Sequence, residues 1–273
     1  MSKKQRWISI AVFGIVIIAL LVGVFLTGGS GASEDIGEVM RDEVLHEGSK
    51  INFFGIKDVN PAVVSAFTVT GIILIFALIV RIFVIPRFKT VPGKFQLLLE
   101  QAVGLFKNLA QSNSPHKNGF LGAYVFTAGT YIFIGTLFEL FGFQVINTAG
   151  VSVSLPAPLA DINGAIALGF LSYFVILSGG IAANGIRGVG RTLKDFSLPI
   201  SMSFRLFGAL LSGALVTELV YYYISLSFVL PVIVGVLFTL LHALIQAYVL
   251  TMLTALFYGE VTEKHPKKAK VQK

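Results

Sequence analysis

The chain has 273 residues, of which 55% are hydrophobic and only 13% are charged, and it carries a net charge of +7. This composition excludes an ordinary soluble domain, whose surface has to be covered by polar groups. The absence of cysteine excludes disulfides, thiolate metal sites and thiol nucleophiles. The sequence therefore predicts an all-α, multi-pass membrane protein.

The N-terminal hydrophobic run extends from Trp7 to Thr27 and follows three cations. This pattern fits a cleaved signal peptide and an uncleaved anchor equally, so both alternatives stay open. We expect residues 1–32 to form this element, followed by an extracytoplasmic segment, a single membrane domain and a basic cytoplasmic tail. The last three parts comprise residues 33–58, 59–258 and 259–273.

Five further apolar stretches are predicted to cross the bilayer as core helices, since a crossing takes about 20 residues. The last two share the 41 residues without Asp, Glu, Lys or Arg between Glu218 and Glu260, with a turn expected near Ser225 to Pro231. The predicted spans are approximately Val59–Val80, Asn118–Phe138, Ile162–Ile186, Ile200–Ile224 and Phe228–Tyr258.

One segment between the first two of these spans differs from them in pattern. Gly93 to Gln111 places apolar side chains at helical spacing, with polar side chains opposite. We expect an amphipathic helix on the cytoplasmic surface of the membrane, and binding of a soluble partner is the alternative.

Of the 21 cations, 17 lie in four segments: the start of the chain, Arg81 to Lys117, Arg187 to Lys194, and Lys264 to Lys273. Cytoplasmic loops of membrane proteins carry an excess of Lys and Arg, so these segments and the C-terminus are predicted to be cytoplasmic. The basic tail is then a solvated anchor against anionic lipid. We expect the location to be the plasma membrane of a bacterium, although an organelle stays open.

Arg205 is the one residue among 21 Lys and Arg that falls inside a predicted span. A cation at this depth costs roughly 3 kcal/mol, so it usually faces a polar cavity or a counter-charge. Gly208, Ala209 and Ser212 fall near the direction of Arg205 on a helix, which lets another helix approach closely. Small-residue packing alone does not require a guanidinium, so a functional role is favoured.

The final span contributes Gln246 and His242, which lie one turn apart and therefore on one face. An antiparallel arrangement brings Gln246 near the depth of Arg205, where its amide can hydrogen-bond the guanidinium or a passing carboxylate. Two interpretations of His242 stay open, because an imidazole can relay protons at neutral pH or can be a hydrogen-bonded packing residue.

Several polar residues are expected toward the outer half of the membrane domain. Glu218 lies 13 residues after Arg205, about 20 Å further along the helix axis and on the opposite face. It is either a proton carrier or a group at the membrane interface. Asp161 and Asn163 open one span from outside, and Glu139 ends the preceding span on the same side. Together they suggest an aqueous inlet, the alternatives being a helix cap for Asp161 and a headgroup position for Glu139.

The chain lacks a nucleotide-binding GxxxxGK[ST] loop, an HExxH motif and a Ser/His/Asp set at catalytic depth. We therefore expect no catalytic chemistry, no cofactor and no metal site. Movement of an ion is the favoured function. A stand-alone secondary transporter is the main alternative, and a membrane scaffold or insertase-like protein is a third.

Four motifs resemble those of the a subunit of rotary, F-type ATP synthases, which is the stator of their membrane sector. The resemblance covers roughly Pro61 to Tyr258. The motifs are VPGKFQ at Val91–Gln96, PLADIN at Pro158–Asn163, PISMSFRLFG at Pro199–Gly208 and LIQAYVLTMLT at Leu244–Thr254.

The resemblance implies two offset half-channels that pass H⁺ to and from carboxylates of the rotor c-ring. Arg205 matches the family's essential arginine, and Gln246 matches the polar partner on the last helix. Asp161 and Asn163 match the mouth of the outer half-channel. The implied partners are the c-ring, the b subunits of the peripheral stalk, the lipid bilayer and, indirectly, the soluble catalytic sector, with no nucleic acid.

The sequence also departs from the family's common bacterial pattern. Ala214 stands where a glutamate is usual, and Glu218 lies one turn beyond it. His242 is one turn closer to the glutamine than the usual histidine. At the cytoplasmic entry an acid is missing, and Asp195 is the nearest substitute. The identity of the inlet carriers, and the choice between H⁺ and Na⁺ as coupling ion, therefore stay open.

Overall fold

The computed structural model describes residues 50–116, 118–148, 150–222 and 230–263, together with residues 14, 15, 18, 22, 37 and 41. Five helices within these residues are long and apolar enough to cross a membrane. This finding confirms the predicted all-α, multi-pass class. The five are α3 (Pro61–Ile79), α5 (Gly119–Phe138), α6 (Ile162–Asn184), α8 (Ser197–Tyr222) and α9 (Leu230–Thr262).

Some predicted segments fall wholly or mostly on residues that are not described. They are the N-terminal run from Trp7 to Thr27, the turn near Ser225 to Pro231, and residues 264–273 of the basic tail.

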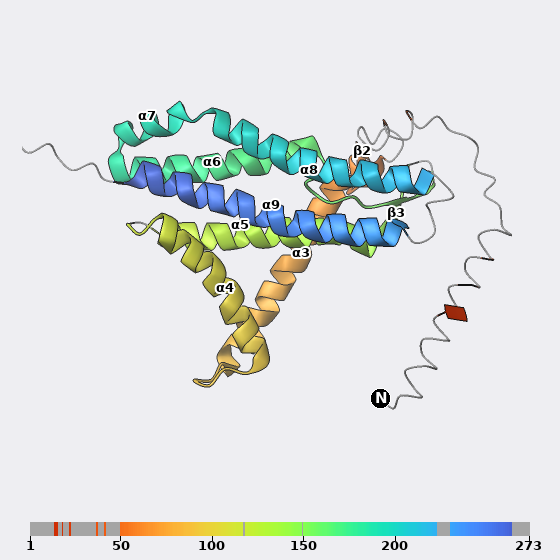
Figure 1. Ribbon diagram of the computed structural model, residues 1–273, viewed down its shortest axis with the longest axis horizontal. Coiled ribbons are helices and arrows are strands. Elements are labelled where there is room, and N and C mark those ends of the chain that lie inside the picture. The colour runs from red at the N-terminus through yellow and green to blue at the C-terminus, as the bar shows by residue number, and fades with distance from the viewer. Residues whose placement is uncertain are drawn as a thin grey trace, which may run out of the picture.

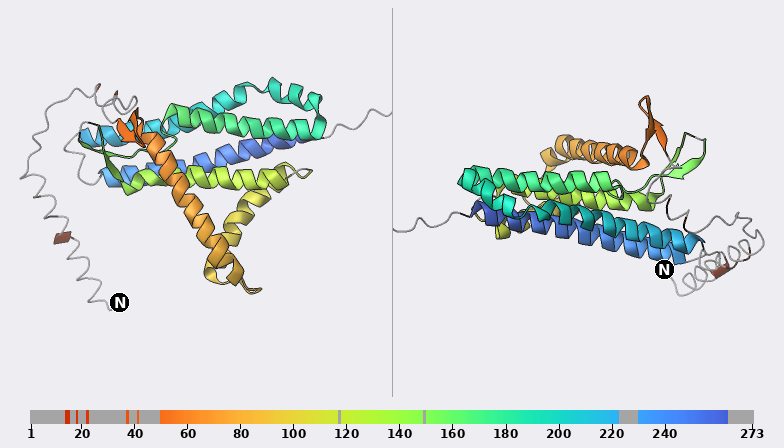
Figure 2. Two further views of the ribbon diagram at one scale, coloured as in Figure 1. Left: turned by 180° about the vertical axis from the view of Figure 1, so that it is seen from behind. Right: turned by 90° about the horizontal axis from the view of Figure 1, so that it is seen from above.

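Helices α5, α6, α8 and α9 run side by side as a bundle (Figures 1 and 2), and α9 contacts the other three. The largest fully buried side chains of this core include Leu121, Ile132, Ile176, Met202 and Leu206. Many Leu, Ile and Phe side chains on the outer faces are exposed instead. Such an apolar exterior is what a bundle surrounded by lipid requires.

The helices of the bundle approach one another most closely at glycines. A Cβ atom on Gly169 of α6 would contact Ser203 and would lie 2.9 Å from the Pro199 carbonyl oxygen, both in α8. Gly179 of α6 faces the ring of Tyr258 in α9 in the same way. Small residues permit such close crossings, which replace the hydrophobic driving force that is missing between helices in lipid.

Helix α3 begins with a clear start signal and then leaves the bundle. The Asn60 side chain accepts a hydrogen bond of 2.9 Å from the Ala62 amide, and Pro61 occupies the first turn. Beyond Ile79 the chain continues through a π-helical turn, η1 (Val80–Val84), and a 3₁₀ turn, η2 (Ile85–Arg87). Figure 1 shows α3 diverging from the bundle toward this end.

Helix α4 (Lys94–Asn113) returns the chain to the bundle, so that α3 and α4 form a V (Figure 1). Its apolar side includes Phe106, which lies over Gly129 of α5, and the buried Ala110. Leu98 and Val103 remain exposed. The helix predicted for Gly93 to Gln111 is therefore present, and its bounds differ from the prediction by one and two residues.

At one end of the bundle a short helix that was not predicted, α7 (Ile186–Lys194), connects α6 to α8. Gly185 makes the turn with φ of +61°, a value that favours glycine. The Asn184 Nδ2 donates to the Val261 carbonyl at 2.8 Å, and the Arg191 Nη1 donates to the Glu263 carbonyl at 3.1 Å. These bonds attach the end of α9 to α6 and α7.

At the opposite end lie two small antiparallel hairpins, which the sequence analysis did not predict. One pairs β1 (Ile51–Phe53) with β2 (Ile56–Val59), and the other pairs β3 (Gln144–Ile146) with β4 (Ser152–Ser154). The Thr148 amide donates to the Lys50 carbonyl at 3.0 Å and so joins the two hairpins.

Candidate functional site

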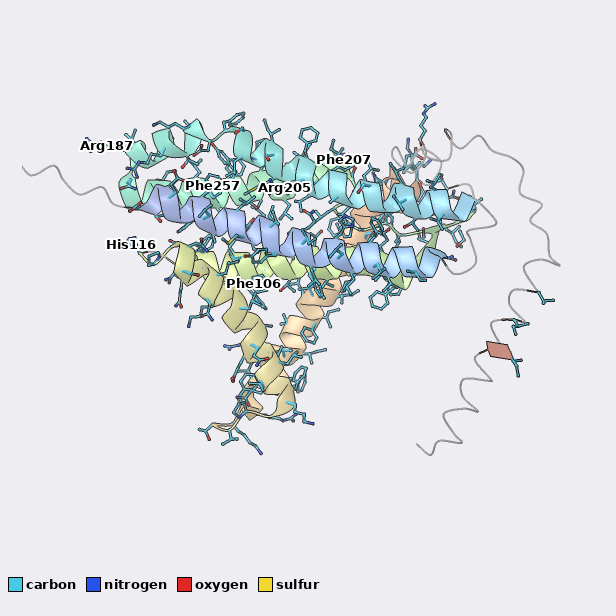
Figure 3. The ribbon with its side chains drawn as sticks, viewed as in Figure 1. Phe106, His116, Arg187, Arg205, Phe207 and Phe257 are labelled. Atoms are coloured by element: carbon cyan, nitrogen blue, oxygen red, sulfur yellow. The ribbon has the colours of Figure 1, made fainter. Side chains whose placement is uncertain are left out.

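Arg205 belongs to α8, on the side where α8 borders α9 (Figure 3). Its side chain is exposed on the outside of the bundle. Its neighbours Met202 and Leu206 point inward and are each 1% exposed. Within the described residues Arg205 has no ion-pair or hydrogen-bond partner. The guanidinium is therefore presented to whatever covers this face.

Gln246 of α9 lines the same narrow crevice as Arg205, together with Met202, Leu250 and Leu253. The crevice has no room for a water molecule. Gln246 is 6% exposed, yet its amide forms no hydrogen bond with another described residue. Among the described residues the only fully buried side-chain N or O atom without a hydrogen-bond partner is Thr136 Oγ1, so the unpaired Gln246 amide still reaches the surface. Both side chains are thus available to a polar group outside the bundle.

The face of α8 around Arg205 carries small side chains. Gly208 and Ser212 are exposed, and a Cβ atom on Gly208 would have no neighbour within 4 Å. The Ser212 hydroxyl donates to the Ala209 carbonyl at 2.9 Å, so it is directed back to its own helix. This open strip gives a neighbouring helix close access to the guanidinium.

A second crevice lies toward the hairpin end of the bundle, between η3 (Glu139–Phe141), α8 and α9. Glu139 and His242 both line it, together with Leu210, Gly213, Ala214 and Thr239. Its volume of about 10 Å³ is close to what one water molecule needs. The imidazole Nδ1 of His242 lies 3.6 Å from the position of a Cβ on Gly213. The structure therefore brings an acid and a histidine from different helices to the lining of one small crevice.

Asp161 and Asn163 lie at the start of α6. Asp161 occupies the N-cap position, but its side chain makes no capping hydrogen bond. Its Oδ1 instead accepts a hydrogen bond of 3.4 Å from the side-chain Nδ2 of Asn163. Neither residue lines the crevice of Glu139 and His242. The nearby Pro158 packs against Gly135 of α5, one turn before Glu139.

Of the two remaining candidates, Asp195 lines neither crevice, and the structure does not describe the side chain of Glu218. Glu218 belongs to the second half of α8, and its side chain is outside the described part of the structure. Asp195 follows α7, half-buried, at the end of the bundle opposite to the hairpins. The carbonyl of Asp195 accepts a hydrogen bond of 2.9 Å from the Leu198 amide in the first turn of α8.

The sequence analysis did not include Thr239 and Gly213 among the site residues. Thr239 lies one turn before His242 and therefore shares its face. Helical spacing in the sequence alone could have identified it. Gly213 gives no such signal, because only the crossing of α8 and α9 places it beside the imidazole.

The two crevices together form an arrangement suited to moving a charge. A permanent cation faces outward in the apolar part of α8, and an acid and a histidine line a small crevice nearer one end. No group of three His, Asp or Glu residues that could hold a metal occurs among the described residues.

Comparisons with known proteins agree on one family. The family model described as ATP synthase A chain matches residues 63–259. Among curated proteins, the ATP synthase subunit a of one strain of Cereibacter sphaeroides is 28% identical over 179 residues, which cover 61% of this chain and 69% of that protein. The subunit a of a second strain has the same identity and coverage.

Proposed function

Because this chain belongs to the ATP synthase A chain family, we propose that it is the subunit that carries ions between the membrane and the rotor of an F-type ATP synthase. Membership makes it a non-catalytic, multi-pass membrane subunit of that complex. The proposal adds two offset half-channels, H⁺ as the coupling ion, a rotor c-ring facing α8 and α9, and peripheral-stalk b subunits as further partners. The observation that carries it is the outward guanidinium of Arg205, which has no partner among the described residues.

A carboxylate on a rotating ring has to be neutral while it faces lipid, because a bare charge there is costly. Beside a fixed cation the ionised form is favoured, so the pKa of the carboxyl falls and the proton leaves. At about 4 Å the attraction amounts to roughly 4 kcal/mol with an effective dielectric constant of 20. Each ring carboxyl would thus release its proton to the adjacent half-channel as it passes Arg205.

Arginine suits this position better than lysine because its guanidinium stays protonated under all ordinary conditions. It therefore attracts the carboxylate without accepting its proton, and no proton can pass directly from one half-channel to the other. The amide of Gln246, in the same crevice and without a partner among the described residues, can donate a hydrogen bond to the same carboxylate. Together the two residues hold the ring site in its ionised state at the point of exchange.

We assign the outer half-channel to the crevice lined by Glu139 and His242, with Asp161, Asn163 and Glu218 nearer its mouth. Its lining contains both an acid and an imidazole, and its volume is close to that of one water molecule, which supports a proton relay. We assign the inner half-channel to the end near Asp195. The membrane potential supplies about 2.3 kcal/mol per charge per 100 mV, which biases the direction of rotation.

Sidedness completes the proposal. The end that carries α7 holds the cations Arg187, Arg191 and Lys194, so we place it and the C-terminus in the cytoplasm. The hairpins then lie outside, in a bacterial plasma membrane.

Transport by the chain in isolation tests the proposal against a stand-alone transporter. The chain purified into liposomes is expected to carry neither H⁺ nor Na⁺ down a gradient, whereas the assembled complex in the same liposomes makes ATP from a proton gradient. Ion uptake by the chain alone would overturn the proposal. ATP synthesis that responds only to a Na⁺ gradient would overturn the choice of H⁺.

Replacing Gly208 with leucine tests whether a ring lies against α8. The chain's own fold has open space there, so its stability is expected to stay unchanged. In the assembled complex the added side chain would overpack a close helix contact, at about 1–3 kcal/mol. We expect proton-driven ATP synthesis to fall about tenfold or more.

Gly71→Leu is the matched control for this variant, because Gly71 of α3 also has no neighbour within 4 Å. It is expected to keep full synthesis. Equal rates of ATP synthesis by the two variants would show that no ring helix packs closely against α8 at Gly208.

Replacing His242 with alanine tests the outer half-channel. Loss of a positioned proton carrier is expected to lower the rate of proton-driven ATP synthesis about 10²-fold, the low end of what such groups contribute. Glu139→Gln is expected to have a similar effect, since both groups line one crevice. His116→Ala is the control, because His116 is exposed outside this crevice. Full synthesis by the His242 variant would exclude this crevice as the proton route.

A further inference from the structure

The apex of the V between α3 and α4 holds a pocket that the proposed ion path does not use. Its volume is about 460 Å³, within the range of small-ligand pockets, roughly 300–1,000 Å³. Three cations line it: Arg87 at the end of η2, Lys89 in the following loop and Lys94 at the start of α4. Among the described residues, no acidic side chain lines it.

These cations are not neutralised by the described part of the chain, where none of the three has an ion-pair partner. The nearest acid along α4 is Glu100, which forms no ion pair with these cations and accepts a hydrogen bond of 2.7 Å from the side-chain Nε2 of Gln96. Three like charges around one pocket repel one another unless an anion lies between them. The pocket is thus electrostatically suited to an anion.

The loop that carries Lys89 is held in place. The Lys89 amide donates to Gln96 Oε1 at 3.1 Å, and Gln96 Nε2 donates back to the Lys89 carbonyl at 3.0 Å. This pair of bonds fixes the backbone of Lys89 against α4. A fixed loop loses less conformational entropy when a ligand binds than a free one does.

The remaining lining identifies the environment of the anion. Phe83, Phe88 and Phe95 line the same pocket and are exposed. Next to them, Ile75, Ile79 and Ile82 form an exposed apolar strip along α3 and η1. Arg87 ends this membrane span and the two lysines follow it, at the level where headgroups begin. An apolar strip that leads into a cationic pocket matches a molecule with an anionic head and hydrocarbon tails.

We propose that the pocket binds the phosphate headgroup of an anionic phospholipid, with its acyl chains along α3. Arg87 offers a planar fork of N–H donors to phosphate oxygens, while the lysines act as point charges. The aromatic rings contact the glycerol and upper acyl region, where such side chains are favoured. This site is independent of Arg205 and of the proposed ion path.

The test uses the assembled complex in detergent, stripped of lipid and mixed with a photoactivatable phosphatidylglycerol whose crosslinks are mapped by peptide mass spectrometry. Crosslinks are expected within residues 83–96. Each cation near a membrane surface contributes a factor of about five, so Lys89→Gln with Lys94→Gln is expected to lower this labelling about 25-fold. Lys107→Gln, an exposed change on the same helix outside the pocket, is expected to leave it unchanged.

Three further arms identify the occupant. A phosphatidylcholine probe is expected to label the segment weakly, and millimolar inorganic phosphate is expected not to compete. In the Arg205→Ala variant, the phosphatidylglycerol probe is expected to label residues 83–96 as strongly as in the unchanged complex. This result would separate the lipid site from the ion path. Unchanged labelling of the double variant, equal labelling by phosphatidylcholine, or displacement by phosphate would each overturn the proposal. So would crosslinks from residues 83–96 to a protein subunit in place of lipid.

Discussion

Arg205→Ala is expected to abolish proton-driven ATP synthesis by the assembled complex. Without the guanidinium, the ring carboxyl loses roughly 4 kcal/mol of stabilisation of its ionised form. Each 1.36 kcal/mol changes a rate tenfold, so deprotonation is expected to slow about 10³-fold. Initial rates of ATP synthesis in proteoliposomes after an acid-to-base shift measure this loss.

Arg205→Lys separates the role of charge from that of a permanent charge. A lysine in an apolar site can lose its proton, and it lacks the guanidinium fork, so this variant is also expected to be defective. Arg187→Gln removes an exposed cation at the end of the bundle (Figure 3) and is expected to keep synthesis. Retained synthesis in Arg205→Ala, with the complex assembled, would contradict the proposed function.

Gly169→Ala is expected to impair the complex almost as severely, although it changes no polar group. The added Cβ would contact Ser203 and lie 2.9 Å from the Pro199 carbonyl oxygen, and that backbone atom cannot rotate away. Helix α8 would have to move, and Arg205 follows Ser203 by only two residues. A displacement of about 1 Å at a reacting centre can cost roughly 10²-fold in rate.

The matched control is Gly71→Ala, since Gly71 has no neighbour within 4 Å and lies in a membrane helix as well. The Gly169 variant is expected to show a lower thermal unfolding temperature together with the loss of synthesis, and the control is expected to show neither. Full activity of Gly169→Ala would mean that α6 does not set the position of Arg205.

Much of the fold was accessible from the sequence because lipid selects long apolar stretches. The predicted spans Asn118–Phe138 and Ile162–Ile186 differ from α5 and α6 by no more than two residues at either end. Helix α7 was missed because its nine residues carry three cations, which is the pattern of a loop. The hairpins were missed because strands of three or four residues give too few alternations to detect.

The sequence could predict those parts of the site whose side chains lie on a single helix or on one antiparallel pair of helices. Counting along two antiparallel spans placed Gln246 near Arg205, and the shared crevice agrees with that count. The meeting of Glu139 with His242 depends on how α5, α8 and α9 are rotated and shifted against one another. That register depends on close contacts such as the one between Gly179 and Tyr258, which periodicity does not contain.

The central position of α9 also has a consequence for biosynthesis. This helix contacts α4, α5, α6 and α8, and its end at Val261 and Glu263 is bonded to α6 and α7. It is also the last of the five membrane helices to leave the ribosome. The earlier helices therefore enter the bilayer with their shared inner face uncovered, and a nascent chain truncated ahead of Leu230 has nothing to fill it. Closure of the bundle must wait until α9 has been synthesised, so membrane quality-control proteases have an interval in which to recognise an incomplete chain.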